Sequence, residues 1–306
     1  MLSSVRMRIV FTIVGVAAVL GGAFFVLHNS DAAAWKSRML SAEVSMGLDQ
    51  MLRTEETVAP TAPLLIKITG PVAATSTEQA RVPILVYHIV RPSYPTDTSA
   101  VITLAHTPEV FNAQMQYLRD AGYHVVSLGA LEDYYKHGTP LPTHPIVITF
   151  DDGWRDQFVY AFPILVKHHY TATFFIFTNP IGRRGFVTWD NLRAMRDAGM
   201  TIGSHSLSHP FLTKTADPIV LWNEINKSKS IIEKNLGITV TEFAYPFGQY
   251  NPAILALVKK AGYTLARGDY LKKSDGLPIL GDRLYELGAL NAPTTTAQFA
   301  RRFPKQ

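Results

Sequence analysis

Short apolar segments alternate with amphipathic segments from residue 82 onward, and this alternation restricts the fold more than any other feature of the chain. The apolar runs predict strands at 84–87, 124–127, 146–150, 172–177, 200–204, 242–245 and 264–266. Helices are expected between them, at 108–121, 128–137, 158–168, 189–198, 218–236 and 252–261. Strand and helix in alternation predict a parallel sheet covered by helices, either a barrel or a doubly wound sheet.

The loop after the predicted strand 146–150 begins with two carboxylates, Asp151 and Asp152, followed by Gly153. Both candidate architectures bind ligands at the carboxyl ends of their strands, so this loop is a place to look for chemistry. On an extended backbone consecutive side chains point to opposite sides, so one carboxylate can bind an ion while its neighbour faces substrate or water. The alternative is an Asp N-cap that opens the following helix.

A second polar loop follows the predicted strand 200–204 and carries His205 and His209. If the chain takes one helical turn there, both imidazoles lie on one face, at a separation that one ion can bridge. Two His and one carboxylate leave coordination positions open for water and substrate, which is typical of catalytic sites. We therefore predict one divalent metal ion, with Zn²⁺ expected from its availability and Co²⁺, Ni²⁺ or Fe²⁺ also suited to these ligands.

The chain resembles the polysaccharide deacetylases, also known as carbohydrate esterase family 4 or the NodB-homology group, over about residues 82–302. The resemblance rests on three motifs, which are "TFDDG" at 149–153, "HSLSH" at 205–209 and "FAYPFG" at 243–248. It implies an α/β fold, a distorted (β/α)7–8 barrel of the NodB-homology type. It also implies a divalent metal and hydrolysis of N-acetyl groups on β-linked amino sugars.

Matched by position, the resemblance implies a role for each motif residue. Asp151 is the general base, and Asp152, His205 and His209 are the metal ligands. The backbone amide of Tyr245 helps to hold the oxyanion. These roles are expectations to be compared with the structure.

Two positions depart from the family pattern. The Arg that usually begins the third motif and braces the base is replaced by Ala244, and the usual late His is missing from residues 284–293. The branch that deacetylates poly-N-acetylglucosamine resembles this chain in carrying its His near the start of the domain. His88, directly after the first predicted strand, is therefore the candidate general acid; the alternative is a core histidine with satisfied hydrogen bonds.

Two tryptophans, Trp154 and Trp189, lie near the predicted loops. Such rings can stack on the faces of sugars and are candidates for substrate contact. They can equally pack against the barrel at the start of a helix. The residues themselves leave both alternatives open.

The N-terminus predicts a membrane anchor. Residues 9–27 are uncharged and follow Arg6 and Arg8, and at 1.5 Å per residue they nearly match a hydrocarbon core of roughly 30 Å. We expect a cytoplasmic stub and single-pass transmembrane helix at 1–28, a juxtamembrane helix and flexible linker at 29–81, and a catalytic domain at 82–306. That domain would lie outside the cytoplasmic membrane, in the periplasm or at the cell surface; cleavage near alanines 32–34 would instead give a secreted protein.

Composition narrows the function further. The chain has no Cys, which excludes disulfides, thiolate metal sites and Cys nucleophiles. Its basic residues are scattered, so no nucleic-acid partner is expected. The expected activity is release of acetate from a polysaccharide that contains N-acetylglucosamine, either poly-N-acetylglucosamine or a peptidoglycan-like chain. The alternatives are a same-fold enzyme for an ester or cyclic amide, and a carbohydrate-binding protein with weak turnover.

Overall fold

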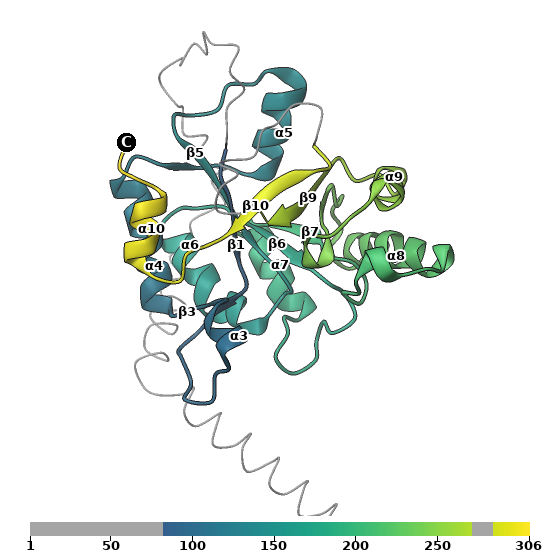
Figure 1. The fold of residues 1–306 in the computed structure, drawn as a ribbon, viewed down its shortest axis with the longest axis horizontal. Helices are drawn as coiled ribbons and strands as arrows, with labels where there is room; N and C mark the ends of the chain where they lie inside the picture. Colours follow the sequence, from purple (N-terminus) through teal and green to yellow (C-terminus); the bar gives the residue numbers. More distant parts are fainter. Residues whose placement is uncertain (1–81, 271–283) are drawn as a thin grey trace, which may run out of the picture. The chain divides into compact units, whose positions relative to one another are not determined.

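A computed structural model describes residues 82–270 and 284–306. A closed barrel of parallel strands forms its centre (Figure 1), made of β1 (Ile84–Tyr87), β5 (Pro145–Phe150), β6 (Thr173–Ile176), β7 (Thr201–Ser204), β8 (Glu242–Ala244), β9 (Leu265–Tyr270) and β10 (Leu287–Asn291). The ring closes because β1 pairs in parallel with both β5 and β10. The barrel prediction is therefore confirmed, and the doubly wound alternative is wrong.

Three short strands lie outside this ring. β4 (His124–Val125) extends the sheet beside the first residues of β5. β2 (Ile89–Val90) and β3 (Ala105–His106) form a separate parallel pair directly after β1. The segment that follows β1 therefore remains anchored close to the barrel.

The helices of the described residues are α3 (Ser99–Ile102), α4 (Pro108–Asp120), α5 (Leu128–His137), α6 (Phe162–Lys167), α7 (Trp189–Asp197), α8 (Pro218–Leu236), α9 (Pro252–Lys260) and α10 (Thr296–Arg302). Side-chain caps open most of them, as where Ser127 accepts from Ala130 N–H. α5 and α8 match their predicted ranges and end at left-handed glycines, Gly138 (φ 70°) and Gly237 (φ 65°).

Several elements differ from the sequence prediction, and β2, β3 and α3 were not predicted. The helix expected at 158–168 begins as a π-helical turn, Gln157–Ala161, before α6. Pro163 lacks an N–H and its ring crowds the preceding turn, which gives a physical reason for the wider turn. β10 and α10 were not predicted: β10 contains Gly288 and Ala289, which have low strand propensity, and α10 is short.

Alternate residues of the strands join two different hydrophobic clusters. Leu85, Ile148 and Phe174 pack with residues of α4, α7, α8, α9 and α10 on the outside of the barrel. Ile84, Val147 and Phe175 belong to a smaller cluster that includes Leu128 and Leu131 of α5. Because strand side chains alternate between the two faces, the smaller cluster fills the barrel interior. Figure 1 shows α10 beside α4, where Tyr117 O–H donates to Phe303 O at 2.8 Å.

In the described part of the chain, no helix has the length and apolar character needed to cross a membrane. The predicted anchor at 9–27 and the predicted linker at 29–81 lie outside the described residues. Both therefore stay predictions from the sequence.

Candidate active site

Polar residues gather where the strands of the barrel end. His88, Asp151 and His205 are each the first residue after a strand, β1, β5 and β7 respectively. Parallel strands bring these positions to one end of the barrel, as the sequence predicts. The side chains converge there: His205 Nε2 lies 3.8 Å from Asp151 Oδ2, and His88 Nε2 lies 3.9 Å from the same oxygen.

The two carboxylates approach the same imidazole rather than pointing to opposite sides. Asp152 Oδ1 lies 3.8 Å from His205 Nε2 and 3.4 Å from His209 Nε2. The expected extended backbone is absent here, because Asp152 (φ 76°) and Gly153 (φ 71°) are both left-handed. A Cβ at Gly153 would lie 3.0 Å from Ile176 Cδ1, so the tight turn also needs glycine for space.

The two imidazoles meet without the helical turn suggested by their spacing. The backbone from His205 to His209 is irregular, with Ser206 (φ 72°) and His209 (φ 61°) in the left-handed region. Nevertheless the two Nε2 atoms lie 3.1 Å apart. The loop geometry, rather than helical periodicity, brings the rings together.

Asp152, His205 and His209 are suited to hold a metal ion. One potential ligand atom from each lies within 4.8 Å of the others. His205 Nδ1 donates to Ala244 O at 2.7 Å, which leaves the Nε2 lone pair for a cation. Burial lowers the pKa of His205 to about 3 and also lowers the pKa of His209, so both rings are in the neutral form that binds metals.

An arginine that the sequence analysis missed holds Asp151. The guanidinium of Arg267, on β9, donates to Asp151 Oδ1, and both side chains are buried. Ala244 and Arg267 are Cα partners on neighbouring strands, so Arg267 occupies the place beside the family's missing arginine. The predicted strand ended at residue 266, just before this polar residue. The register that places Arg267 beside Ala244 is visible only in the folded barrel.

The surroundings shift the pKa values of Asp151 and Asp152 in opposite directions. Burial raises the pKa of Asp151, but the charge of Arg267, together with electrostatic interactions with the imidazoles of His205 and His88, outweighs it and holds this pKa at about 2. Burial and the adjacent Asp151 charge raise the pKa of Asp152. Asp151 is therefore the ionised member of the pair over a wide pH range.

His88 belongs to the cluster rather than to the hydrophobic core. Its side chain is 13% exposed, which leaves it accessible at the mouth of the site. The amide of Gln157, another residue missed from the sequence, donates to the backbone carbonyls of both His88 and Asp151. The buried Gln157 thus ties the loop after β1 to the loop after β5.

The expectation for the Tyr245 amide does not hold in this structure. Tyr245 N–H donates to Arg267 O at 2.9 Å, as part of the pairing between β8 and β9. Its hydroxyl donates to Tyr285 O at 3.1 Å. Both donors are thus engaged within the protein, and the amide is not directed at an oxyanion.

The two tryptophans have different surroundings. Trp154 Nε1 donates to Asp152 Oδ2 at 3.0 Å, and its ring stacks on Phe186 with centroids 4.6 Å apart. It therefore orients a candidate metal ligand. Trp189, the first residue of α7, packs against the main hydrophobic cluster. Packing is the better account of Trp189.

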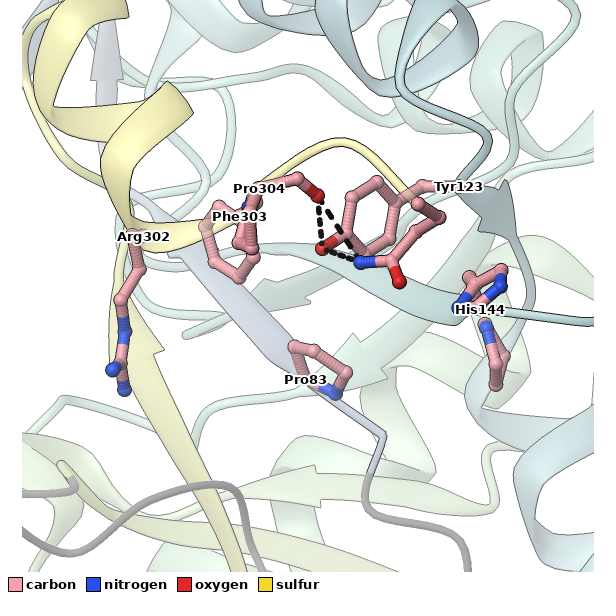
Figure 2. Close-up of a pocket in the computed structure, with 8 residues that line it drawn as sticks. Pro83, Tyr123, His144, Arg302, Phe303 and Pro304 are labelled. Atoms are coloured by element: carbon pink, nitrogen blue, oxygen red, sulfur yellow. Dashed lines mark hydrogen bonds between the residues drawn. The ribbon is translucent and has the colours of Figure 1, made fainter.

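A pocket of about 440 Å³ lies at the other end of the barrel, where Pro83 precedes β1 and Pro145 begins β5. Figure 2 shows Tyr123 and Phe303 in its wall, where Gln306 Nε2 donates to Tyr123 Oη at 2.7 Å. The Asp and His cluster follows the carboxyl ends of the strands instead. The pocket is therefore separate from the candidate active site.

Fold and site together define a parallel β/α-barrel protein with an Asp/His cluster suited to a divalent cation. The family model for polysaccharide deacetylase matches residues 138–266, a range that includes Asp151, Asp152, His205 and His209. The matched range includes all three motifs, so the resemblance drawn from them is confirmed.

Known proteins agree with this assignment. YxkH of Bacillus subtilis (strain 168) is 28% identical over 61% of this chain and 63% of its own length. The poly-β-1,6-N-acetyl-D-glucosamine N-deacetylase of Staphylococcus aureus (strain MRSA252) is 30% identical over 50% of this chain and 57% of its own length. The chain thus spans about three fifths of these relatives. The Streptococcus pyogenes deacetylase PplD, solved with acetate, supports the fold, with a TM-score of 0.67, 24% identity and coverage of 74% of this chain and 100% of that one.

Proposed function

We propose that this protein is a metal-dependent deacetylase that hydrolyses N-acetyl groups of a polysaccharide containing N-acetylglucosamine and releases acetate. The observation that carries the proposal is the convergence of Asp152, His205 and His209 within 4.8 Å of one another, beside Asp151 and His88. A binding protein would have no use for a buried, ionised carboxylate next to an open cation site. Hydrolysis uses both.

The residues that would hold the cation are Asp152, His205 and His209, and the ion expected is Zn²⁺. When bound, a divalent cation polarises the acetyl carbonyl and lowers the pKa of a water from about 16 towards 7. Two hydrogen bonds orient the proposed ligands: Trp154 Nε1 donates to one oxygen of Asp152, and the Ala244 carbonyl accepts from His205 Nδ1 and so fixes its tautomer. Such contacts orient ligands and sharpen metal affinity.

Asp151 is the proposed general base. Arg267 donates to one carboxylate oxygen, Oδ1, and the other, Oδ2, faces His88 and His205. A carboxylate whose pKa is about 2 accepts a proton weakly by itself. It can therefore take a proton only from a water that is already acidified, which ties the base to the cation site.

His88 is the proposed general acid. Loss of an amine from the tetrahedral intermediate requires a proton on the nitrogen, and an imidazole is the side chain best matched to deliver it near neutral pH. His88 lies nearest to Oδ2 of Asp151, whereas Arg267 holds Oδ1, and the partly exposed side chain of His88 allows a leaving group to reach it. No late-strand His is needed if His88 acts in its place.

The proposed substrate is a β-linked polymer of N-acetylglucosamine outside the cytoplasmic membrane. Support comes from the name of the Staphylococcus aureus relative and from the early position of His88. The uncharged segment 9–27 supports attachment to that membrane by a single N-terminal helix. Neither the linkage of the polymer nor the anchor is part of the described structure.

Acetate release from N-acetylglucosamine oligomers tests the proposal. The full-length chain should release acetate with added Zn²⁺, lose that activity with a chelator, and regain it when metal is restored. Asp152→Asn should abolish both zinc binding and acetate release, whereas Asp190→Asn, a change at a side chain 87% exposed on α7, should leave both unchanged. Comparing β-1,6-linked with β-1,4-linked oligomers distinguishes the polymers. Equal acetate release with and without chelator would refute the metal dependence.

A further inference from the structure

Glu224 on α8 reaches the loop that carries the two imidazoles. Its carboxylate accepts from Leu207 N–H at 3.1 Å and from Ser208 N–H at 2.8 Å, both at Oε2, and from Ser208 O–H at 2.6 Å at Oε1. Glu224 is only 6% exposed. A single buried carboxylate thus accepts three hydrogen bonds from two consecutive residues between His205 and His209.

The loop needs such an anchor because its backbone is unfavourable by itself. Ser206 and His209 are left-handed although neither is glycine, a conformation that persists only where surrounding contacts hold it. Other hydrogen bonds also restrain the loop: His209 N–H donates to Ser206 Oγ at 2.9 Å, Asn179 N–H to Leu207 O at 2.9 Å and Thr178 N–H to Ser206 O at 3.3 Å. Among these contacts, the Glu224 carboxylate is the one that reaches the loop from a helix.

α8 is itself fixed to the strand that delivers His205. Ser228, one turn after Glu224, makes a hydrogen bond of 2.7 Å with Ser204, the last residue of β7. Tyr263 O–H donates to Ile225 O at 2.9 Å. Glu224 is therefore held on a rigid support, so its carboxylate can set the position of the loop.

We propose that Glu224 is a positioning residue of the metal site, which holds the 205–209 loop so that His205 and His209 present their Nε2 atoms to one cation. This inference rests on the proposed function, because it assumes that the two imidazoles bind metal. Glu224 itself binds no metal; it acts through the backbone of Leu207 and Ser208. Supports of this kind typically change metal affinity by about 10- to 100-fold when they are removed.

Zinc affinity of the full-length chain, measured by competition with a chromophoric chelator, tests the assignment. Glu224→Ala should weaken Zn²⁺ binding by about 10- to 100-fold. Glu224→Gln keeps the side-chain shape and one accepting oxygen, and the Ser208 hydroxyl can accept from the new amide instead of donating. The loss of zinc affinity in this variant should therefore be less than about tenfold. The matched control is Asp217→Ala at the N-cap of the same helix: Asp217 is exposed and caps α8 through Ile219 N–H at 2.7 Å, about two turns before Glu224. It should lose stability without losing zinc affinity.

Glu224→Ala binding zinc within about threefold of the wild type would overturn the assignment, as would an equal loss in Asp217→Ala. If Glu224→Ala does not fold, the double variant Glu224→Gln with Ser208→Ala decides, because it lacks both the second accepting oxygen and the Ser208 hydroxyl. Unchanged zinc affinity in this double variant would also overturn the assignment. The two proposals fail differently. A wild-type chain that binds zinc but releases no acetate refutes the deacetylase function, whereas the comparison of variants remains valid.

Discussion

Replacing Arg267 with Ala should lower the free energy of unfolding, because it leaves the buried Asp151 carboxylate without its main counter-charge. Asp151 has no exposed side-chain area and Arg267 has 1%. Burial raises the pKa of Asp151, and Arg267 contributes the largest of the charges that bring this pKa down to about 2. Without Arg267 the carboxylate keeps its burial and loses its main counter-charge.

The magnitude follows from the pKa of Asp151. The difference between its ordinary value of 3.8 and about 2 corresponds to about 2.5 kcal/mol at about 1.4 kcal/mol per pH unit. Removing one partner of a buried ion pair typically costs about 3 to 5 kcal/mol. We therefore expect Arg267→Ala to lose at least about 2.5 kcal/mol of unfolding free energy at pH 7.

The pH dependence has a definite sign. A folded-state pKa below the unfolded value adds stability above pH 3.8, and this stability is lost as the pH falls through about 2. The difference in unfolding free energy between wild type and Arg267→Ala should therefore become smaller at acid pH. Urea unfolding of the chelator-treated protein at pH 7 and at acid pH measures it.

A second substitution tests position rather than charge alone. Ala244 is the Cα partner of Arg267, so an Arg placed there leaves the same face of the sheet. Ala244→Arg combined with Arg267→Ala should recover much of the stability and acetate release, whereas Arg301→Ala, at an exposed residue of α10, should change neither. Two results would refute the role of Arg267: a loss of unfolding free energy of less than about 1 kcal/mol in Arg267→Ala, or a difference from wild type that stays constant down to pH 2.

Three further substitutions have defined outcomes. His88→Ala should slow acetate release by about 10²- to 10⁴-fold while zinc stays bound; nearly full activity would contradict the general-acid role. Gly203→Ala places a Cβ 2.6 Å from Phe175 Cδ1, so urea unfolding should show a loss of about 1 to 3 kcal/mol, and an unchanged midpoint would contradict this. Burial raises the pKa of Glu242 from 4.5 to about 7, so wild-type stability should fall as pH rises through that window. Glu242→Gln should remove this fall and gain about 3 kcal/mol by pH 8; an advantage that does not grow between pH 5 and 8 would be inconsistent with a buried, titrating Glu242.

The site was predictable where it depends on position along a strand. His88, Asp151 and His205 each follow an apolar strand directly, and parallel strands must bring such positions to one end of the barrel. The conformation of the loops was not predictable in the same way. Asp152 and His209 adopt left-handed conformations that are uncommon for any residue other than glycine, and the contacts that hold them become visible only in the folded structure.

The sequence by itself determined the alternation of strands and helices from the first strand to residue 266, the barrel as one of two architectures, and the Asp and His loops that carry the chemistry. These follow from local periodicity and from where strands end. Tertiary structure alone decided that Arg267 braces Asp151, that the Tyr245 amide is used within the sheet, and that Glu224 supports the imidazole loop. Each of these depends on which residues become neighbours when the barrel closes, and residues that are 16 to 116 positions apart in the chain have no local pattern that records such a contact.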